Sequence, residues 1–212
     1  MSEITRLFNN VKRAKPLDGT SAFGGNASRK ATAVALATAH RAADDFIQGT
    51  FWEEDGESDD NSWEGFKGCA VGCLTHTQDD PHQRLGDYYG IPRTLAHLAD
   101  DVFEALHEGV CRDFPLAFIK AIPVGADLRP VAAKFYLLIA KRYADTSFFP
   151  SVPYFEAEAE TPGIGRPNFD NMDDLTMAYH AYIPQRVIAE TPELKRDAPF
   201  LRDELLRLVA SA

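Results

Sequence analysis

The residues with the most obvious chemical potential lie in the stretch KGCAVGCLTHTQDDPH, residues 67–82. Cys69, Cys73, His76 and His82 fall within fourteen positions of one another. Thiolate sulfur and imidazole nitrogen are ligands that zinc and other transition metals accept, so these four residues are the candidate metal ligands. A histidine beside a cysteine can also lower the pKa of the thiol and make it a nucleophile. The third interpretation is tight packing, because a buried free cysteine behaves as a small hydrophobic residue.

The glycines beside the two cysteines favour packing. Gly68 and Gly72 are four residues apart, so on a helix they lie on one face and let a neighbouring helix approach. The spacing of the four candidate ligands fits a structural zinc site less well. Such sites pair their ligands in a tight knuckle, whereas five residues separate His76 from His82. We therefore favour packing, with a metal site and a reactive thiol as the alternatives.

A second polar group follows Pro92. His97, Asp100, Glu104 and His107 have the spacing of one helical face, and Asp101 completes the possible polar cluster. Asp101 and Glu104 could work as paired carboxylates, and Glu104 with His107 has the Glu-x-x-His spacing of di-metal carboxylate proteins. Asp79 with His82 is the nearest match to the second pair that such a site needs. A water-facing polar surface is the simpler interpretation.

Helices must position these residues. Apolar spacing predicts an all-α protein, a single globular multi-helix domain of about six to eight helices. One helix should start at Asn26 or Ser28 and run to residue 48, with His40 as a core residue on its apolar face. A second should cover residues 61–76, starting at Asn61 or Ser62. A third should follow Pro92, with one apolar stripe. That stripe is Ile91, Leu95, Leu98, Val102 and Leu106.

Three segments fall outside this helical pattern. Residues 1–26 are expected to form a flexible basic arm, and residues 27–212 a single helical domain. That domain contains an acidic loop at 53–60, with six acids and no base, and an irregular loop at 145–170 with four prolines. Large aromatic side chains in the second loop are candidate contacts to a partner. They are Phe148, Phe149, Tyr154 and Phe155.

Charge and composition narrow the function classes. The chain of 212 residues has 22 Lys and Arg, 32 Asp and Glu, and a net charge of −10. Such a body would repel phosphates, so direct nucleic-acid binding would have to use the N-terminal arm, where residues 1–43 carry seven basic and two acidic side chains. No secretory signal or membrane span is expected, and three cysteines form no disulfide framework, which predicts a cytoplasmic protein. The sequence leaves open whether the chain forms a homo-oligomer.

Residues 67–138 resemble a group of uncharacterised bacterial and phage proteins. Those proteins share a GCxxGC stretch followed by GIP, LxxLEDxIFEGL and GADL. The matching positions here are Gly68, Cys69, Gly72, Cys73, Gly90, Ile91, Pro92, Leu98, Asp101, Phe103, Glu104, Phe114, Gly125, Ala126, Asp127 and Leu128. Ala99 and Ala105 stand where the pattern has an acid and a glycine. The resemblance implies no established activity, but it suggests a phage or mobile-element setting.

These observations lead to two functional hypotheses. The first is a non-catalytic acidic helical protein that binds another protein and needs no cofactor. It rests on the acidic and aromatic loops and on the incomplete catalytic motifs. The alternative is a metal- or thiol-dependent enzyme that combines the Cys/His stretch 69–82 with the carboxylates of 100–104 and uses zinc or another transition metal.

Overall fold

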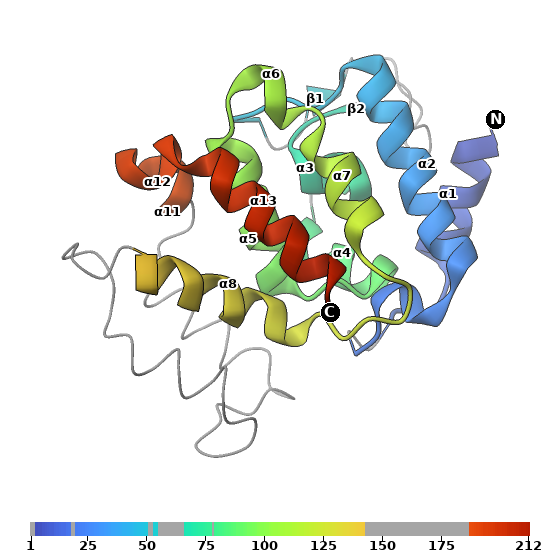
Figure 1. Cartoon of the computed structure of the whole chain (residues 1–212). Coiled ribbons are helices and arrows are strands. Elements are labelled where there is room, and N and C mark those ends of the chain that lie inside the picture. The colour runs from blue at the N-terminus through green and yellow to red at the C-terminus, as the bar shows by residue number, and fades with distance from the viewer. Residues whose placement is uncertain (1–2, 18–19, 51–52, 55–65, 78, 143–186) are drawn as a thin grey trace.

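The computed structural model describes residues 3–17, 20–50, 53–54, 66–77, 79–142 and 187–212 (Figure 1). The predicted all-α class is confirmed, because helices make up nearly all of the regular structure in these residues. The elements are α1 Glu3–Arg13, η1 Ala22–Gly25, α2 Ala27–Ala43, β1 Glu53–Glu54, β2 Phe66–Lys67, α3 Ala70–Thr75, α4 Pro81–Tyr89, α5 Arg93–Ala105, α6 Glu108–Cys111, α7 Phe114–Ala121, α8 Arg129–Arg142, α11 Val187–Glu190, α12 Pro192–Arg196 and α13 Ala198–Ala210. None of the helices in the described part of the chain has the length and apolar character needed to cross a membrane.

Helix α5 lies at the centre of the fold. It packs against α3 and α4 as well as against α8, α11 and α13. The stripe predicted after Pro92 is fully buried, with Leu95, Leu98 and Val102 at 0% exposure. Each such side chain stabilises the fold by roughly 1.5–3 kcal/mol when it leaves water. This one helix therefore joins the element that carries the cysteines to the elements at the C-terminus.

Helix α2 starts where the sequence predicts but ends earlier. The Asn26 side chain accepts hydrogen bonds from the backbone N–H groups of Ser28 (2.8 Å) and Arg29. The helix stops at Ala43 because Asp44 adopts a left-handed conformation, with φ of 64°. The chain then runs beside the segment before α3, through a parallel bridge between Phe46 and Gly68. The prediction of helix up to residue 48 is therefore wrong.

The segment before α3 also differs from the prediction. Helix α3 covers only six residues, and Cys69 is its N-cap instead of a mid-helix residue. Phe66 and Lys67 form β2, which pairs antiparallel with β1. Residues 55–65 lie outside the described residues. The i, i+4, i+7 face expected for Cys69, Cys73 and His76 is therefore not formed, because the helix starts after the first and ends before the third.

The N-terminal segment contains a helix where a flexible arm was expected. Helix α1 packs against α2 at the edge of the molecule (Figure 1). Val11 and Thr5 are buried by this contact. The sequence signal was the helical spacing of Ile4, Leu7 and Val11, which the basic residues around them obscure.

Helix α13 packs against both α7 and α8, and α7 also packs against α2 (Figure 1). Leu201 and Leu205 of α13 are fully buried beneath them, as their spacing predicted, and Leu208 is half-buried. The irregular loop 145–170, with its aromatic candidates, and residues 55–60 of the acidic loop fall outside the described residues.

Candidate functional site

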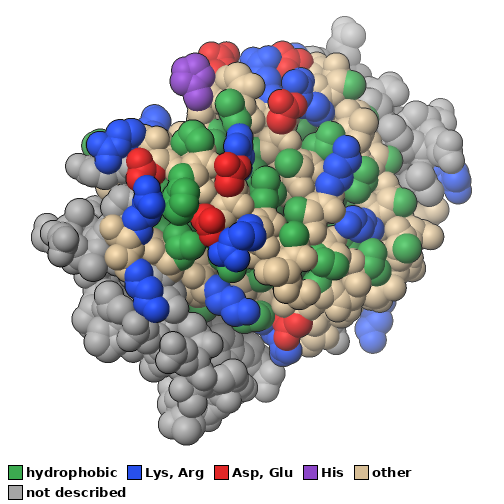
Figure 2. Space-filling model, in the orientation of Figure 1, with side chains coloured by type: hydrophobic (Ala, Val, Ile, Leu, Met, Phe, Trp, Pro, Cys, Tyr) green, Lys and Arg blue, Asp and Glu red, His purple; other side chains and the backbone are tan. Residues whose placement is uncertain are grey.

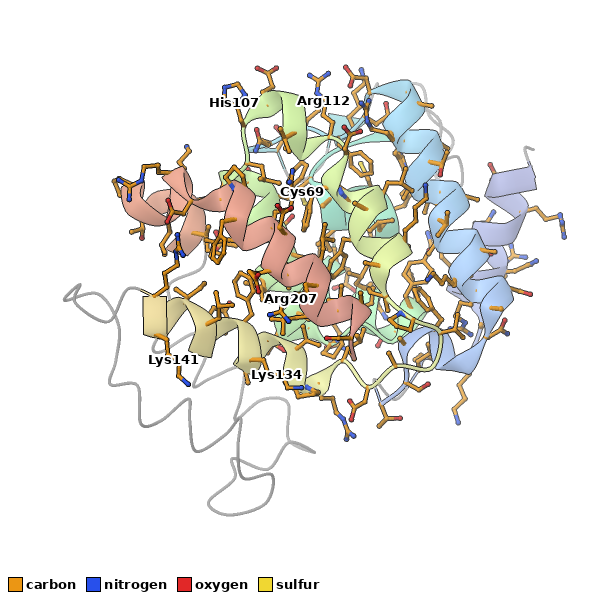
Figure 3. The ribbon with its side chains drawn as sticks, viewed as in Figure 1. Cys69, His107, Arg112, Lys134, Lys141 and Arg207 are labelled. Atoms are coloured by element: carbon orange, nitrogen blue, oxygen red, sulfur yellow. The ribbon has the colours of Figure 1, made fainter. Side chains whose placement is uncertain are left out.

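Buried titratable side chains gather on both sides of α3. Figure 3 shows Cys69 in the interior of the molecule. The group includes four of the six histidines of the chain. Its buried members are His40, Asp45, Cys69, Cys73 and His76, and its half-buried members are His82, His97 and Asp100. Buried ionisable groups are costly unless they are paired, so such a concentration marks a candidate functional centre.

The first network joins α2 to the end of α3. The His40 Nδ1 atom lies 3.0 Å from the Asp45 Oδ2 atom, and its Nε2 atom lies 2.7 Å from the Nε2 atom of His76. His40 is 0% exposed, so its prediction as a core residue is confirmed. We call this set the Asp45–His40–His76 chain.

Two left-handed residues make this network. Asp44 reverses the backbone after α2 and brings Asp45 back toward His40. His76 caps α3 with φ of 47° and ψ of 53°. A left-handed backbone at a residue other than glycine costs about 1–3 kcal/mol. The surrounding contacts must hold His76 in place, which indicates that its position is specified by the fold.

Burial lowers the pKa of His76 well below its usual value of 6.5. The charges of His40 and Lys12 act in the same direction, and a hydrogen bond to the backbone of Cys73 opposes them. The histidine is therefore held in its neutral form over the physiological pH range.

Cys73 is a packing residue. Its thiol donates to the backbone carbonyls of Gly68 (3.5 Å) and Asp45 (3.6 Å). Burial, and then the charge of Asp45, raises the pKa of the Cys73 thiol well above its usual value. The thiol therefore stays protonated and poorly nucleophilic, as the packing interpretation requires.

The second network lies on the other side of α3. The His82 Nε2 atom is 3.3 Å from the Asp100 Oδ2 atom. The rings of His82 and His97 stack with centroids 3.7 Å apart and an interplanar angle of 14°. The other oxygen of Asp100 is buried with no hydrogen-bond partner. We call Cys69, His82, His97 and Asp100 the α3–α5 cluster.

The cysteine of this cluster is not activated. The Cys69 sulfur accepts a hydrogen bond from the Gly72 N–H at 3.5 Å. Burial, followed by the negative charge of Asp100, raises the pKa of the Cys69 thiol well above its usual value. A nucleophilic cysteine needs a cationic group or a base that favours the thiolate, whereas Asp100 favours the protonated thiol.

The predicted paired carboxylates have structural contacts instead. Asp101 is buried, and its two oxygens accept hydrogen bonds from the backbone N–H groups of Ile188 (2.9 Å) and Ala189 (3.1 Å), at the start of α11. Glu104 accepts from the Gly49 N–H at 2.8 Å. Of the polar face that was expected to look at water, His97, Asp100 and Glu104 are half-buried and only His107 is exposed. His107 lies beyond the end of α5, exposed at the start of α6 (Figure 3).

The four candidate metal ligands divide between the two networks. Cys73 and His76 contact α2 and the segment after it, whereas Cys69 and His82 lie beside Asp100. In the described ranges, no three His, Cys, Asp or Glu side chains are grouped as a metal ion would require. The structure therefore assigns these four residues separate internal contacts.

Sequence reasoning missed Asp45 as a partner of His40. No local motif marks it, because its position depends on the left-handed turn at Asp44 and on the bridge to Gly68. The pair Asp44 and Asp45 at the end of the helical pattern could have indicated this turn, because aspartate adopts a left-handed backbone more readily than most residues.

No protein-family model matches the chain, and neither a curated protein nor a solved structure shows significant similarity to it.

Proposed function

We propose that the protein acts by binding another protein rather than by catalysis. The observation that carries this proposal is the surface formed by α7, α8 and α13, where half-buried apolar side chains lie among charged side chains of both signs (Figure 2). We call it the α7–α8–α13 face. Its apolar residues are Leu116, Ala121, Leu138, Phe200, Leu206 and Leu208.

The charge of this face differs from that of the whole chain. The chain carries −10, yet α8 contains four basic residues and no acid. Lys134 and Lys141 are exposed on α8, and Figure 3 shows both pointing away from the body, with Arg207 on α13. A basic helix in an acidic protein would attract an acidic partner surface and repel other basic ones.

Arg142 and Phe200 supply an anchor of the kind found at protein interfaces. The Arg142 guanidinium lies over the Phe200 ring, 4.1 Å from its centroid, and also 3.4 Å from the Asp197 carboxylate. These contacts restrict a long side chain that is 45% exposed. Arginine and aromatic residues are enriched among the residues that dominate binding energy, and prior ordering lowers the entropic cost of binding.

The internal contacts of the candidate catalytic residues point the same way. Cys69 and Cys73 are buried and protonated, and Asp101 and Glu104 hold backbone N–H groups. The free thiols of the three cysteines suit the reducing cytoplasm that we propose as the location. The resemblance to bacterial and phage proteins is compatible with a host protein as partner.

Charge reversal on the face tests this proposal. The variant Lys134→Glu/Lys141→Glu changes the face, and Arg13→Glu/Lys15→Glu changes the net charge equally at exposed positions of the N-terminal segment. Each variant is immobilised, and proteins retained from a bacterial lysate are quantified by mass spectrometry. A partner lost by the face variant and kept by the control supports the proposal. Equal retention by both variants, after matched circular dichroism spectra, refutes it.

A second candidate function is a thiol-dependent enzyme at the α3–α5 cluster, although burial and Asp100 keep the Cys69 thiol protonated. Its thiol, carboxylate and imidazoles come from three different elements, and one oxygen of Asp100 lacks a hydrogen bond. Native protein is treated with iodoacetamide at pH 7.5 and digested, and the alkylation of Cys69 is compared with that of Cys111. Alkylation of Cys69 faster than in urea would establish a reactive thiol. Metal analysis of the same sample, purified without a metal-affinity column, tests the zinc alternative.

A further inference from the structure

Charge is divided unequally between the N-terminal helices and the rest of the chain. Residues 1–43 carry seven basic and two acidic side chains, a net charge of +5, so the remaining residues carry −15. Helix α1 packs against α2 at the edge of the molecule, far from α8 (Figure 1). The basic residues of the N-terminal segment therefore lie at one edge of an otherwise acidic protein.

The contact with α2 decides which side of α1 faces water. Thr5 and Val11 are buried in this contact. Arg6 and Arg13 lie two helical turns apart on the side of α1 opposite Val11, and both are exposed. Seven residues of α-helix rise about 10 Å. Lys15, also exposed, follows the end of the helix. We call Arg6, Arg13 and Lys15 the α1 basic row.

Two cations of the row are not neutralised by the described part of the chain. There, the side chains of Arg13 and Lys15 pair with no acidic group. Asp87 lies near the end of the N-terminal segment, because its backbone carbonyl accepts the Leu17 N–H at 3.0 Å. Its carboxylate, however, pairs with Arg84 at 3.0 Å. Arg13 and Lys15 therefore keep their positive charge for a partner outside the chain.

Helix α2 adds two cations that are held by carbonyl groups instead of carboxylates. The Arg29 guanidinium donates to the backbone carbonyl of Tyr88 at 2.8 Å. The Lys30 ammonium donates to the carbonyls of Lys120 (2.9 Å) and Ile122 (2.6 Å). A neutral carbonyl leaves the net charge of its donor unchanged, so both residues raise the positive potential of this edge.

Stabilisation of the helix end explains only one member of the row. Basic side chains in the last turn of a helix interact favourably with its dipole, which accounts for Arg13. Arg6 lies near the start of α1, where the dipole favours the opposite charge, and Lys15 lies beyond the helix. An extended polyanion that follows the helix would account for all three.

The chemistry of the row fits the phosphate backbone of a nucleic-acid duplex. Arginine and lysine bind phosphates without reading the base sequence. By helical spacing, Leu7 and Phe8 share the side of Val11, so the outward side offers no aromatic ring on which an unpaired base could stack. Repulsion between the acidic body and phosphates makes the α1 edge the favourable approach.

We propose that α1 binds double-stranded DNA through the phosphate contacts of its basic row, independently of base sequence. DNA is favoured over duplex RNA because the major groove of B-form DNA admits an α-helix, whereas that of A-form RNA is too narrow. This activity is separate from the proposed protein-binding face, because α1 lies far from α8 (Figure 1).

Fluorescence anisotropy of a labelled random-sequence DNA duplex tests the proposal. Affinity is measured between about 50 and 200 mM NaCl, and three phosphate contacts should give a slope of log affinity against log salt of about −3. Arg13→Glu/Lys15→Glu should weaken binding by at least about tenfold at the lowest salt and reduce the slope by about two. Lys134→Glu/Lys141→Glu changes the net charge equally at exposed positions of α8 and should stay close to wild type, because salt screens distant charges.

Four results would overturn the proposal. The first is no binding of the wild-type chain to DNA at the lowest salt. The second is equal weakening by the two double variants with matched circular dichroism spectra, which would make binding a response to overall charge. The third is tighter binding to an RNA duplex of the same sequence. The fourth is sedimentation with phosphatidylserine vesicles, lost in Arg13→Glu/Lys15→Glu, in a chain that does not bind DNA. If the reversed pair fails to fold, Arg13→Gln replaces it and should reduce the slope by about one.

Discussion

Asp101→Ala should destabilise the protein strongly, because Asp101 is a buried acceptor for two backbone N–H groups. The carboxylate accepts from Ile188 and Ala189 at 2.9 and 3.1 Å, at the start of α11. A hydrogen bond to a charged group contributes about 1.5–3 kcal/mol. Local unfolding of the four-residue α11 limits the loss, so we expect about 3 kcal/mol of the free energy of unfolding to disappear. Asp101→Asn keeps one acceptor oxygen and should lose roughly half of that.

Urea denaturation followed by circular dichroism measures both variants. The matched control is Asp113→Ala, which removes an exposed carboxylate paired with Arg41 and should cost less than about 0.5 kcal/mol. If Asp101→Ala stays within 0.5 kcal/mol of the control, or if the Asn and Ala variants lose equally, the carboxylate does not act as this acceptor. A catalytic carboxylate is commonly costly to stability, so a more stable Asp101→Asn would also reopen the enzyme hypothesis.

Three further predictions concern other parts of the chain. Tyr89→Phe should raise the free energy of unfolding by about 1 kcal/mol, because the Tyr89 hydroxyl is buried without a hydrogen-bond partner; a loss measured in urea would contradict this. Below pH 6.5 the unfolded chain takes up a proton that folded His76 resists, so stability should fall with pH by up to about 1.4 kcal/mol per pH unit; thermal unfolding from pH 7.5 to 5 should lack this component in His76→Gln. Deletion of residues 148–155 tests whether the aromatic side chains of this segment add a second contact to the partner, in which case capture should weaken with an unchanged urea midpoint; a lowered midpoint would instead assign these residues to packing.

The parts of the fold that sequence predicts well are those fixed by local signals. The start of α2 follows from the side chain of Asn26, which reaches the N–H groups two and three residues ahead. The position of α5 follows from Pro92 and from a stripe that repeats at helical spacing. Both signals depend on residues within a few positions along the chain. Contacts with distant segments therefore do not change where these two helices begin.

The parts that escaped prediction depend on partners far along the chain. Cys69 caps α3 because Phe66 and Lys67 are taken up by β1, and because Gly68 bonds to the segment after α2. Residues 67–76 have the spacing of a helix, yet Lys67 and Gly68 form β-type hydrogen bonds with other segments. The cysteines and histidines consequently separate into two networks, which no spacing rule within the stretch can anticipate.

The carboxylates of α5 show the same limit at a single helix. Residues three apart share a helical face, so Asp101 and Glu104 are neighbours on α5 and qualify as a pair by spacing alone. In the structure, backbone N–H groups of Ile188 and Gly49, from segments far apart in the sequence, reach these two side chains. Asp100, one residue away, turns to His82. Sequence spacing identifies the side chains that share a helical face. It does not show which carboxylates accept hydrogen bonds from backbone N–H groups of distant segments, and only a carboxylate without such bonds is available for catalysis. One buried oxygen of Asp100 lacks a hydrogen bond, which makes Asp100 the first carboxylate of this helix to test for a catalytic role.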